Sequence, residues 1–186
     1  MSEWRCKCRW TTGARVSVLA LALAACGDEV CGAAVDAGAV AALVTVDGLP
    51  LRFGEFRSLL AGDCGRASIS VGGRQEGSGY PLTLCVIDPA SAGSAPVPLD
   101  DAARIDLVDL SAHVAGCDYQ LDFDATPEGT VAFDGLCADG AGPGFNLTLA
   151  GRVAGIRRCA SDAGPPVDEP VSFELAGTVA VRNVSP

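Results

Sequence analysis

The sequence contains few of the residue types that carry most enzyme and metal chemistry. Its 186 residues include one histidine, one methionine and one lysine, and aromatic residues make up 5% of the chain. The single histidine, His113, excludes metal sites built from several histidines. The single lysine, Lys7, lies near the amino terminus, so the rest of the chain can form neither a Schiff base nor a Walker-type phosphate loop.

Positive charge is scarce as well. The chain has 13 basic residues against 23 acidic ones and a net charge of −10, which repels a polyanion and excludes nucleic acid as a partner. Hydrophobic residues and cysteines are abundant, at 49% of the chain and nine residues respectively. A chain of this composition can bury enough apolar surface to fold, so general disorder is excluded too.

The amino terminus has the layout of a secretory signal peptide. Residues 1–15 contain four basic residues and one acid, and the uncharged apolar run Val16–Ala25 follows them. This run is too short to span a bilayer, which takes about 20 residues. We therefore expect a segment that is removed during export.

The end of this segment, Leu23-Ala24-Ala25-Cys26, resembles the lipobox of bacterial lipoprotein precursors. The resemblance covers residues 1–27. It implies cleavage before Cys26 and acylation of that cysteine, which anchors the protein in a bilayer of the bacterial cell envelope. Because Gly27 follows the cysteine, the resemblance permits export to the outer membrane as well as a periplasmic location. The alternative is an ordinary signal peptide in which Cys26 occurs by chance.

This interpretation divides the chain into three parts. We expect a signal peptide over residues 1–25, a flexible tether over 26–38 and a single β domain over 39–186. Removing residues 1–25 takes away four basic residues and one acid, so the net charge becomes −13. Every basic residue that remains is an arginine.

Six cysteines remain once Cys26 is assigned to the lipid anchor. An even number in an exported chain predicts three disulfides, but six cysteines allow 15 pairings. They are Cys31, Cys64, Cys85, Cys117, Cys137 and Cys159.

One pairing follows from a predicted hairpin. Two alternating runs, Asp118–Asp124 and Thr130–Asp134, flank Thr126-Pro127-Glu128-Gly129, a sequence typical of a type I turn. The hairpin would place Cys117 opposite Cys137 on its apolar face. For the other four cysteines the pairs Cys31 with Cys64 and Cys85 with Cys159 are weakly preferred, and Cys64 with Cys85 is the competing arrangement.

Short alternating runs separated by Gly, Pro, Asp and Ser indicate an all-β fold. Their regular spacing predicts an antiparallel β-sandwich or a barrel-like domain. A short helix is also compatible with Phe56–Leu60 or with Ser111–Ala115. The predicted strands beside the hairpin are Ala42–Asp47, Leu51–Phe53, Ala67–Val71, Leu82–Asp88, Ile105–Leu110, Phe145–Val153 and Val171–Arg182.

Candidate catalytic residues are few. Asp109, Ser111 and His113 are the residue types of a hydrolase triad, but residues two apart on one strand stand in a row and cannot form the successive hydrogen bonds that a triad needs. We therefore assign no catalytic residue and no cofactor.

The sequence also contains acidic residues that could form a calcium-binding loop. Asp118, Asp122, Asp124 and Glu128 offer oxygen ligands, but the glycine of an EF-hand loop is missing and Pro127 interrupts the run. We interpret these acids as a solvated strand face and predict no metal site.

Two functions remain. The first is a non-enzymatic envelope lipoprotein whose β domain binds a protein or small ligand or has a structural role. The second is a secreted hydrolase that uses paired carboxylates, for example on glycans, for which the number of acids is the only support.

Overall fold

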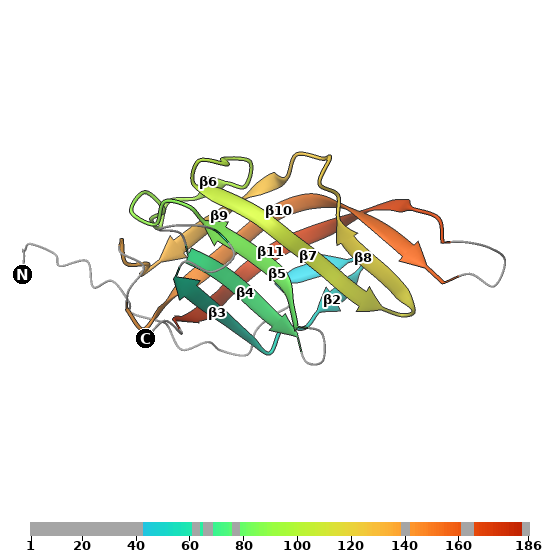
Figure 1. Ribbon diagram of the computed structural model, residues 1–186, viewed down its shortest axis with the longest axis horizontal. Helices are drawn as coiled ribbons and strands as arrows, with labels where there is room; N and C mark the ends of the chain where they lie inside the picture. Colours follow the sequence, from blue (N-terminus) through green and yellow to red (C-terminus); the bar gives the residue numbers. More distant parts are fainter. Residues whose placement is uncertain are drawn as a thin grey trace, which may run out of the picture.

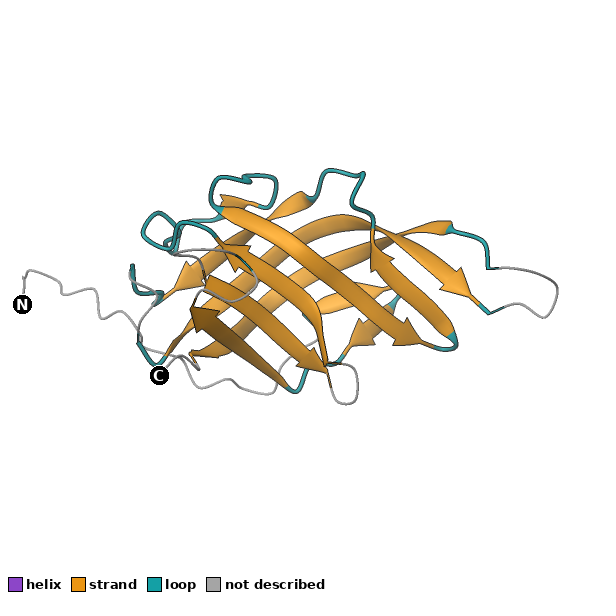
Figure 2. Cartoon of the chain, in the orientation of Figure 1, coloured by secondary structure: helices purple, strands orange, loops and turns teal. Residues whose placement is uncertain are grey.

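The computed structural model describes residues 43–60, 64, 69–75, 79–138, 142–160 and 166–183. The predicted signal peptide, the tether and Cys26 and Cys31 lie outside these residues. The described part contains strands and loops and no helix, which confirms the all-β class (Figure 2). The strands are β1 (Val44–Val46), β2 (Leu49–Leu51), β3 (Glu55–Leu60), β4 (Ile69–Gln75), β5 (Gly79–Val86), β6 (Val97–Pro98), β7 (Ile105–Val114), β8 (Cys117–Leu121), β9 (Glu128–Asp134), β10 (Gly144–Cys159) and β11 (Glu169–Asn183).

All eleven strands belong to one sheet, and its pairings return to the strand from which they start. The circuit runs β11-β3-β4-β5-β7-β8-β10 and back to β11. β11 and β3 are parallel, and the other neighbours are antiparallel. Figure 1 shows β3, β4, β5 and β7 as a slanted layer in front of β10 and β11. Of the two expected architectures, this closed sheet corresponds to the barrel-like one.

The two longest strands, β10 and β11, form a hairpin that organises the sheet. Their register extends from Gly144 opposite Arg182 to Arg157 opposite Glu169. On its other edge each long strand pairs with two short strands that lie end to end, β9 and β8 on β10, and β3 and β1 on β11. The junction between β8 and β9 matters for the site, because strand pairing is interrupted there.

The core lies inside the closed sheet. Alternate residues of β10 and β11, such as Leu147, Leu149, Phe173 and Val181, are at most 3% exposed. Burying a side chain of this size stabilises a protein by about 1.5–3 kcal/mol. The apolar face that period-two alternation predicts is therefore the inner face of the sheet.

Both proposed helices are strands. In β3, Phe56 and Ser58 are buried while Arg57 between them is half-buried, which is the period of a strand. Ser111–Val114 belongs to β7, and the turn Ala115-Gly116 leads into β8. Pairing with β4 and with β8 satisfies the backbone groups that a short helix would have left partly unpaired.

The predicted hairpin between residues 118 and 134 is wrong. β8 and β9 do not pair with each other, because both pair with β10, one after the other. Cys117 therefore faces Cys159 of β10 and is bonded to it, so the pairings Cys117 with Cys137 and Cys85 with Cys159 are both wrong. Cys137 is buried and disulfide-bonded to a different cysteine.

The competing arrangement for the remaining cysteines is confirmed. Cys64, in the connection between β3 and β4, is bonded to Cys85 of β5, so the pairing of Cys31 with Cys64 is wrong. This bond fastens the connection across β4 to the next strand. The spacing of the cysteines alone does not reveal such a contact between a loop and a strand.

Candidate functional site

The site begins at the interruption between β8 and β9. Leu121 pairs with Gly155 and Glu128 pairs with Arg152, so six residues, Asp122–Pro127, lie opposite only two residues of β10. The loop is compact, because the Asp122 backbone N–H donates to Ala154 O at 3.1 Å and Asp122 Oδ1 accepts from the N–H of residue 124 at 3.1 Å.

A glycine makes the re-entry of the chain into β9 feasible. Gly151 has a φ of 137°, and a Cβ at this position would lie 2.4 Å from the carbonyl oxygen of Glu128. Only glycine fits this close approach of the two strands. Gly151 of β10 therefore leaves room for the backbone at the start of β9.

A pocket of about 340 Å³ lies between this loop and the segment that leads into β7. The buried side chains of Ile105, Leu107, Leu121 and Val153 line it. Its volume is at the lower end of the range for small-molecule sites. Apolar walls of this kind suit the hydrocarbon part of a ligand.

Two interactions hold the segment before β7 in place. The Leu99 N–H donates to Gly129 O at 2.9 Å, which ties the segment to β9. Arg104 pairs with Asp101 at 2.6 Å (Nη2 to Oδ2). The two sides of the pocket are therefore fixed to strands of the sheet.

Four aspartates line the same pocket, and none of them has an ion-pair partner among the described residues. They are Asp100, Asp106, Asp122 and Asp124. Phe123 lies between the last two, and 72% of its surface is exposed. Carboxylates and the face of an aromatic ring both attract cations. The arrangement is suited to a cation with an apolar body.

The residues that suggested a hydrolase triad lie in a row on β7, and their hydrogen bonds do not form a triad. Ser111 hydrogen-bonds to Asp109, and His113 Nδ1 lies 2.6 Å from Asp118 Oδ1 of β8. Burial raises the pKa of Asp109, and the hydrogen bond from Ser111 opposes this. The histidine pairs across the hairpin, so it does not activate the serine.

The acids that suggested a calcium loop are also spread apart. Asp118 belongs to β8 and Glu128 to β9, while Asp122 and Asp124 lie in the loop between them. Within the described ranges no group of three His, Cys, Asp or Glu side chains could hold a metal ion.

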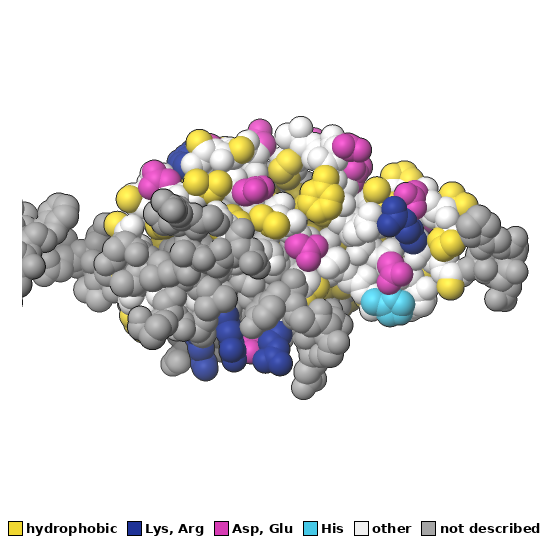
Figure 3. Space-filling view, viewed as in Figure 1, with side chains coloured by type: hydrophobic (Ala, Val, Ile, Leu, Met, Phe, Trp, Pro, Cys, Tyr) yellow, Lys and Arg dark blue, Asp and Glu magenta, His cyan; other side chains and the backbone are white. Residues whose placement is uncertain are grey.

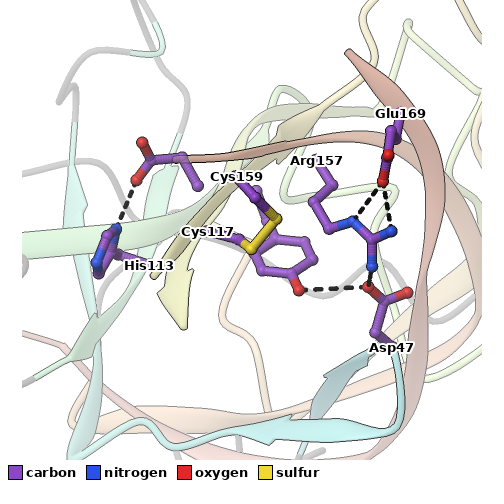
Figure 4. Close-up of a disulfide and its surroundings, with 8 residues drawn as sticks. Asp47, His113, Cys117, Arg157, Cys159 and Glu169 are labelled. Atoms are coloured by element: carbon purple, nitrogen blue, oxygen red, sulfur yellow. Dashed lines mark hydrogen bonds and ion pairs between the residues drawn. A yellow bond between two sulfur atoms is a disulfide. The ribbon is translucent and has the colours of Figure 1, made fainter. Parts of the chain in front are cut away.

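A second charged cluster lies around Arg157, which faces Tyr119 in the middle of β8 (Figure 4). The Asp47 carboxylate accepts from Arg157 Nη1 at 2.6 Å and from the Tyr119 hydroxyl at 3.3 Å. Glu169 Oε2 accepts from Arg157 Nε at 3.0 Å and from Nη2 at 2.5 Å. The hydrogen bonds to Glu169, Asp47 and Tyr119 raise the pKa of Arg157.

This cluster joins three hairpins. Asp47 occupies the turn between β1 and β2, where it and Gly48 both have positive φ, as two-residue hairpin turns require. Tyr119 comes from the β7–β8 hairpin, and Arg157 with Glu169 comes from β10 and β11. Local sequence patterns do not reveal this cluster, because Asp47 and Arg157 are 110 residues apart.

The pocket could not be predicted from the sequence either. The acidic run contains Asp122 and Asp124, but nothing in the sequence links them to Asp100 or Asp106, which approach from the other side. The sequence signal that could have pointed to the pocket was Phe123, a large apolar residue between two aspartates.

No helix in the described ranges is long and apolar enough to cross a membrane. Comparisons with protein families, with curated proteins and with solved structures gave no significant match.

Proposed function

We propose that this protein is a lipid-anchored lipoprotein of the bacterial cell envelope, and that its β domain is a non-enzymatic binding module. The lipobox-like sequence that ends at Cys26 supports the anchor. Two disulfides, Cys64 with Cys85 and Cys117 with Cys159, support an oxidising compartment outside the cytoplasm.

The pocket beside β7 is the observation that carries the binding role. It combines buried apolar walls with four aspartates that have no ion-pair partner within the described ranges. The ligand class that fits it is a small amphipathic cation, an ammonium group on an aliphatic or aromatic body. Binding such a ligand needs no nucleophile and no general base. It would also account for the excess of acidic residues in the chain.

The anchor is tested by mass spectrometry of the membrane fraction. The mature chain should begin at an acylated Cys26, and Cys26→Ser should abolish acylation and release the chain from the membrane. An unmodified amino terminus at another residue would contradict the lipoprotein assignment.

The pocket is tested with a pair of probes that differ in charge. The 2-phenylethylammonium ion should shift the backbone amide signals of Asp122–Pro127 in NMR titrations, and the neutral 2-phenylethanol should shift them far less. Asp106→Asn with Asp124→Asn should weaken binding of the cation roughly fivefold. Asp88→Asn with Asp134→Asn removes the same charge from exposed residues outside the pocket and should leave binding unchanged. Equal shifts with both probes would refute recognition of the charge.

The alternative, a carboxylate-dependent hydrolase, uses the same pocket. Four aspartates around one cavity are what favours it, since such enzymes need two carboxylates beside the bond that is cleaved. Asp100→Asn, Asp106→Asn, Asp122→Asn and Asp124→Asn test it singly on glycan substrates. Loss of a catalytic acid or base would lower turnover by about 10²–10⁴-fold, whereas the binding module has no turnover to lose.

A further inference from the structure

Among the described residues, one edge of β7 has no strand partner where it borders the pocket. β7 pairs with β5 along one edge from Ile105 to Leu110, but on its other edge it pairs with β8 only from Ser111 onward. Ile105, Asp106 and Leu107 line the pocket. Proteins usually cover or protect such an edge, because its backbone donors and acceptors can pair with another strand.

The register shows which backbone groups of β7 point away from β5, toward the pocket. In an antiparallel pair, residues that bond to the partner strand alternate with residues whose N–H and C=O point away from it. The N–H of Ile87, directly after β5, donates to Arg104 O at 2.7 Å, so Arg104 directs its backbone toward β5. Ile105 and Leu107 therefore direct theirs the other way, and the Ile105 N–H accordingly donates to Asp101 O at 2.9 Å.

The backbone of Leu107 is available for pairing on this side. No described residue donates to it or accepts from it there, because β8 begins to pair farther along β7. The loop after β8 does not take its place, since the Asp122 N–H donates to Ala154 O of β10 instead. Leu107 thus presents one donor and one acceptor, the pair of groups that a neighbouring strand uses.

The space beside Leu107 is wide enough for one strand. β7 and β10 both pair with β8, and neighbouring strands lie about 4.8 Å apart, so β7 and β10 are roughly 9.6 Å apart where β8 lies between them. β8 ends at Leu121, and the pocket beyond it is lined by Leu107 of β7 and Val153 of β10. An extended segment in the pocket would continue the line of β8.

The two faces of β7 determine which side chains such a segment should carry. Leu107 is buried on the inner face, whereas Asp106 is exposed on the outer face. Residues directly opposite each other on neighbouring strands point to the same face, with Cβ atoms about 4.5–5.5 Å apart. The residue opposite Leu107 should therefore be apolar, and its neighbour opposite Asp106 should be basic. Figure 3 shows acidic side chains among apolar ones in this area, where β7 and the loop after β8 lie in Figure 1.

We propose that the pocket binds an extended peptide segment of a partner protein, which adds to β7 as an antiparallel strand in the line of β8. The backbone of the segment pairs with Leu107, an apolar side chain enters the pocket, and the lysine beside it pairs with Asp106. The inference rests on the cation site proposed above, and it identifies the cation as a lysine side chain. Asp122 and Asp124, on the other side of the pocket, add to the attraction for this charge.

The first test changes the ligand, so that it does not depend on the folding of a variant. The probe is an acetylated and amidated pentapeptide, threonine-valine-lysine-valine-threonine, titrated into the protein used for the 2-phenylethylammonium experiment. It should shift the amide signal of Leu107 and slow hydrogen exchange at this N–H. A peptide with N-methylated valines keeps its charge but loses the N–H groups that pair with Leu107, so it should bind about tenfold more weakly.

The second test locates the charge. Replacing the lysine of the peptide by norleucine should weaken binding roughly fivefold. In Asp106→Lys, the ratio of the affinities for the lysine peptide and for its glutamate analogue should fall by about tenfold or more. The matched reversal Asp134→Lys, at an exposed residue of β9 outside the pocket, should leave this ratio nearly unchanged. The amide spectra report whether each variant is folded.

Three outcomes would overturn strand addition. Equal affinities of the parent and the N-methylated peptide would show that the backbone does not pair. An equal fall of the affinity ratio in Asp106→Lys and Asp134→Lys would show that the lysine does not lie opposite Asp106. Binding of 2-phenylethylammonium without binding of the pentapeptide would leave the cation site in place and exclude the peptide. Failure of the cation site itself would be seen separately, as equal shifts with 2-phenylethylammonium and 2-phenylethanol.

Discussion

Two charged regions adjoin β8, and they differ in whether their carboxylates are paired. Around Tyr119, in the middle of the strand, the Arg157 guanidinium pairs with Asp47 and Glu169, and Tyr119 donates to the same Asp47 carboxylate. At the end of β8 the pocket presents carboxylates without ion-pair partners among the described residues, next to an exposed Phe123. Satisfied charges hold hairpins together, and unsatisfied ones remain available to a ligand. The two regions thus differ in role: the first stabilises the fold, and the second is the one that we propose binds a ligand.

The largest effect is expected from removing the disulfide at the start of β8. Cys117→Ser with Cys159→Ser should lower the free energy of unfolding by about 4 kcal/mol, because the bond closes a long loop in the unfolded chain. Cys64→Ser with Cys85→Ser should lower it by about 3 kcal/mol, since the two residues are 21 apart instead of 42. Urea unfolding followed by circular dichroism measures both. Equal stability of the first variant and the parent would refute a stabilising role for this end of β8.

A smaller loss of stability is expected from Arg157→Met. The variant leaves Asp47 and Glu169 facing each other without their shared cation, so the urea midpoint should fall, by less than in the disulfide variant. Arg157→Lys should recover only part of the loss, because one ammonium group cannot reproduce a guanidinium that donates through three nitrogens. An unchanged urea midpoint in Arg157→Met would mean that these ion pairs do not stabilise the fold.

The smallest effect on stability is expected in the pocket. Phe123→Leu should change the free energy of unfolding by no more than about 0.5 kcal/mol, because the ring is largely exposed. The affinity for 2-phenylethylammonium should nevertheless fall about two- to fivefold with the loss of the aromatic face. Thermal unfolding and NMR titration measure the two quantities. A large loss of stability with unchanged affinity would contradict the roles proposed for the pocket and the Arg157 cluster.

The sequence predicts the fold best where the pattern is local. Alternation identified the strands, as in Phe145–Val153 and Val171–Arg182, because successive residues of a strand face opposite sides whichever strand lies next to it. It failed for Phe56–Leu60, a run too short to distinguish a strand from a helical turn.

It failed again where two partners compete for the same strand. Thr126–Gly129 has the composition of a tight turn, and the runs on each side alternate, so a local hairpin was the natural prediction. The length of β10 offers both runs a better partner, and β8 and β9 pair with it in succession. The error in the disulfide followed directly, since Cys117 bonds to the residue that faces it.

By itself, the sequence determined the fold class and the scarcity of catalytic residue types, and it predicted an exported chain with a lipid anchor. These properties depend on composition, on short-range alternation and on one short motif. The tertiary structure alone decided which cysteines meet and which carboxylates share a pocket. Those relations depend on the partners that each strand takes in the closed sheet, because residues far apart in sequence become neighbours only when the strands pair.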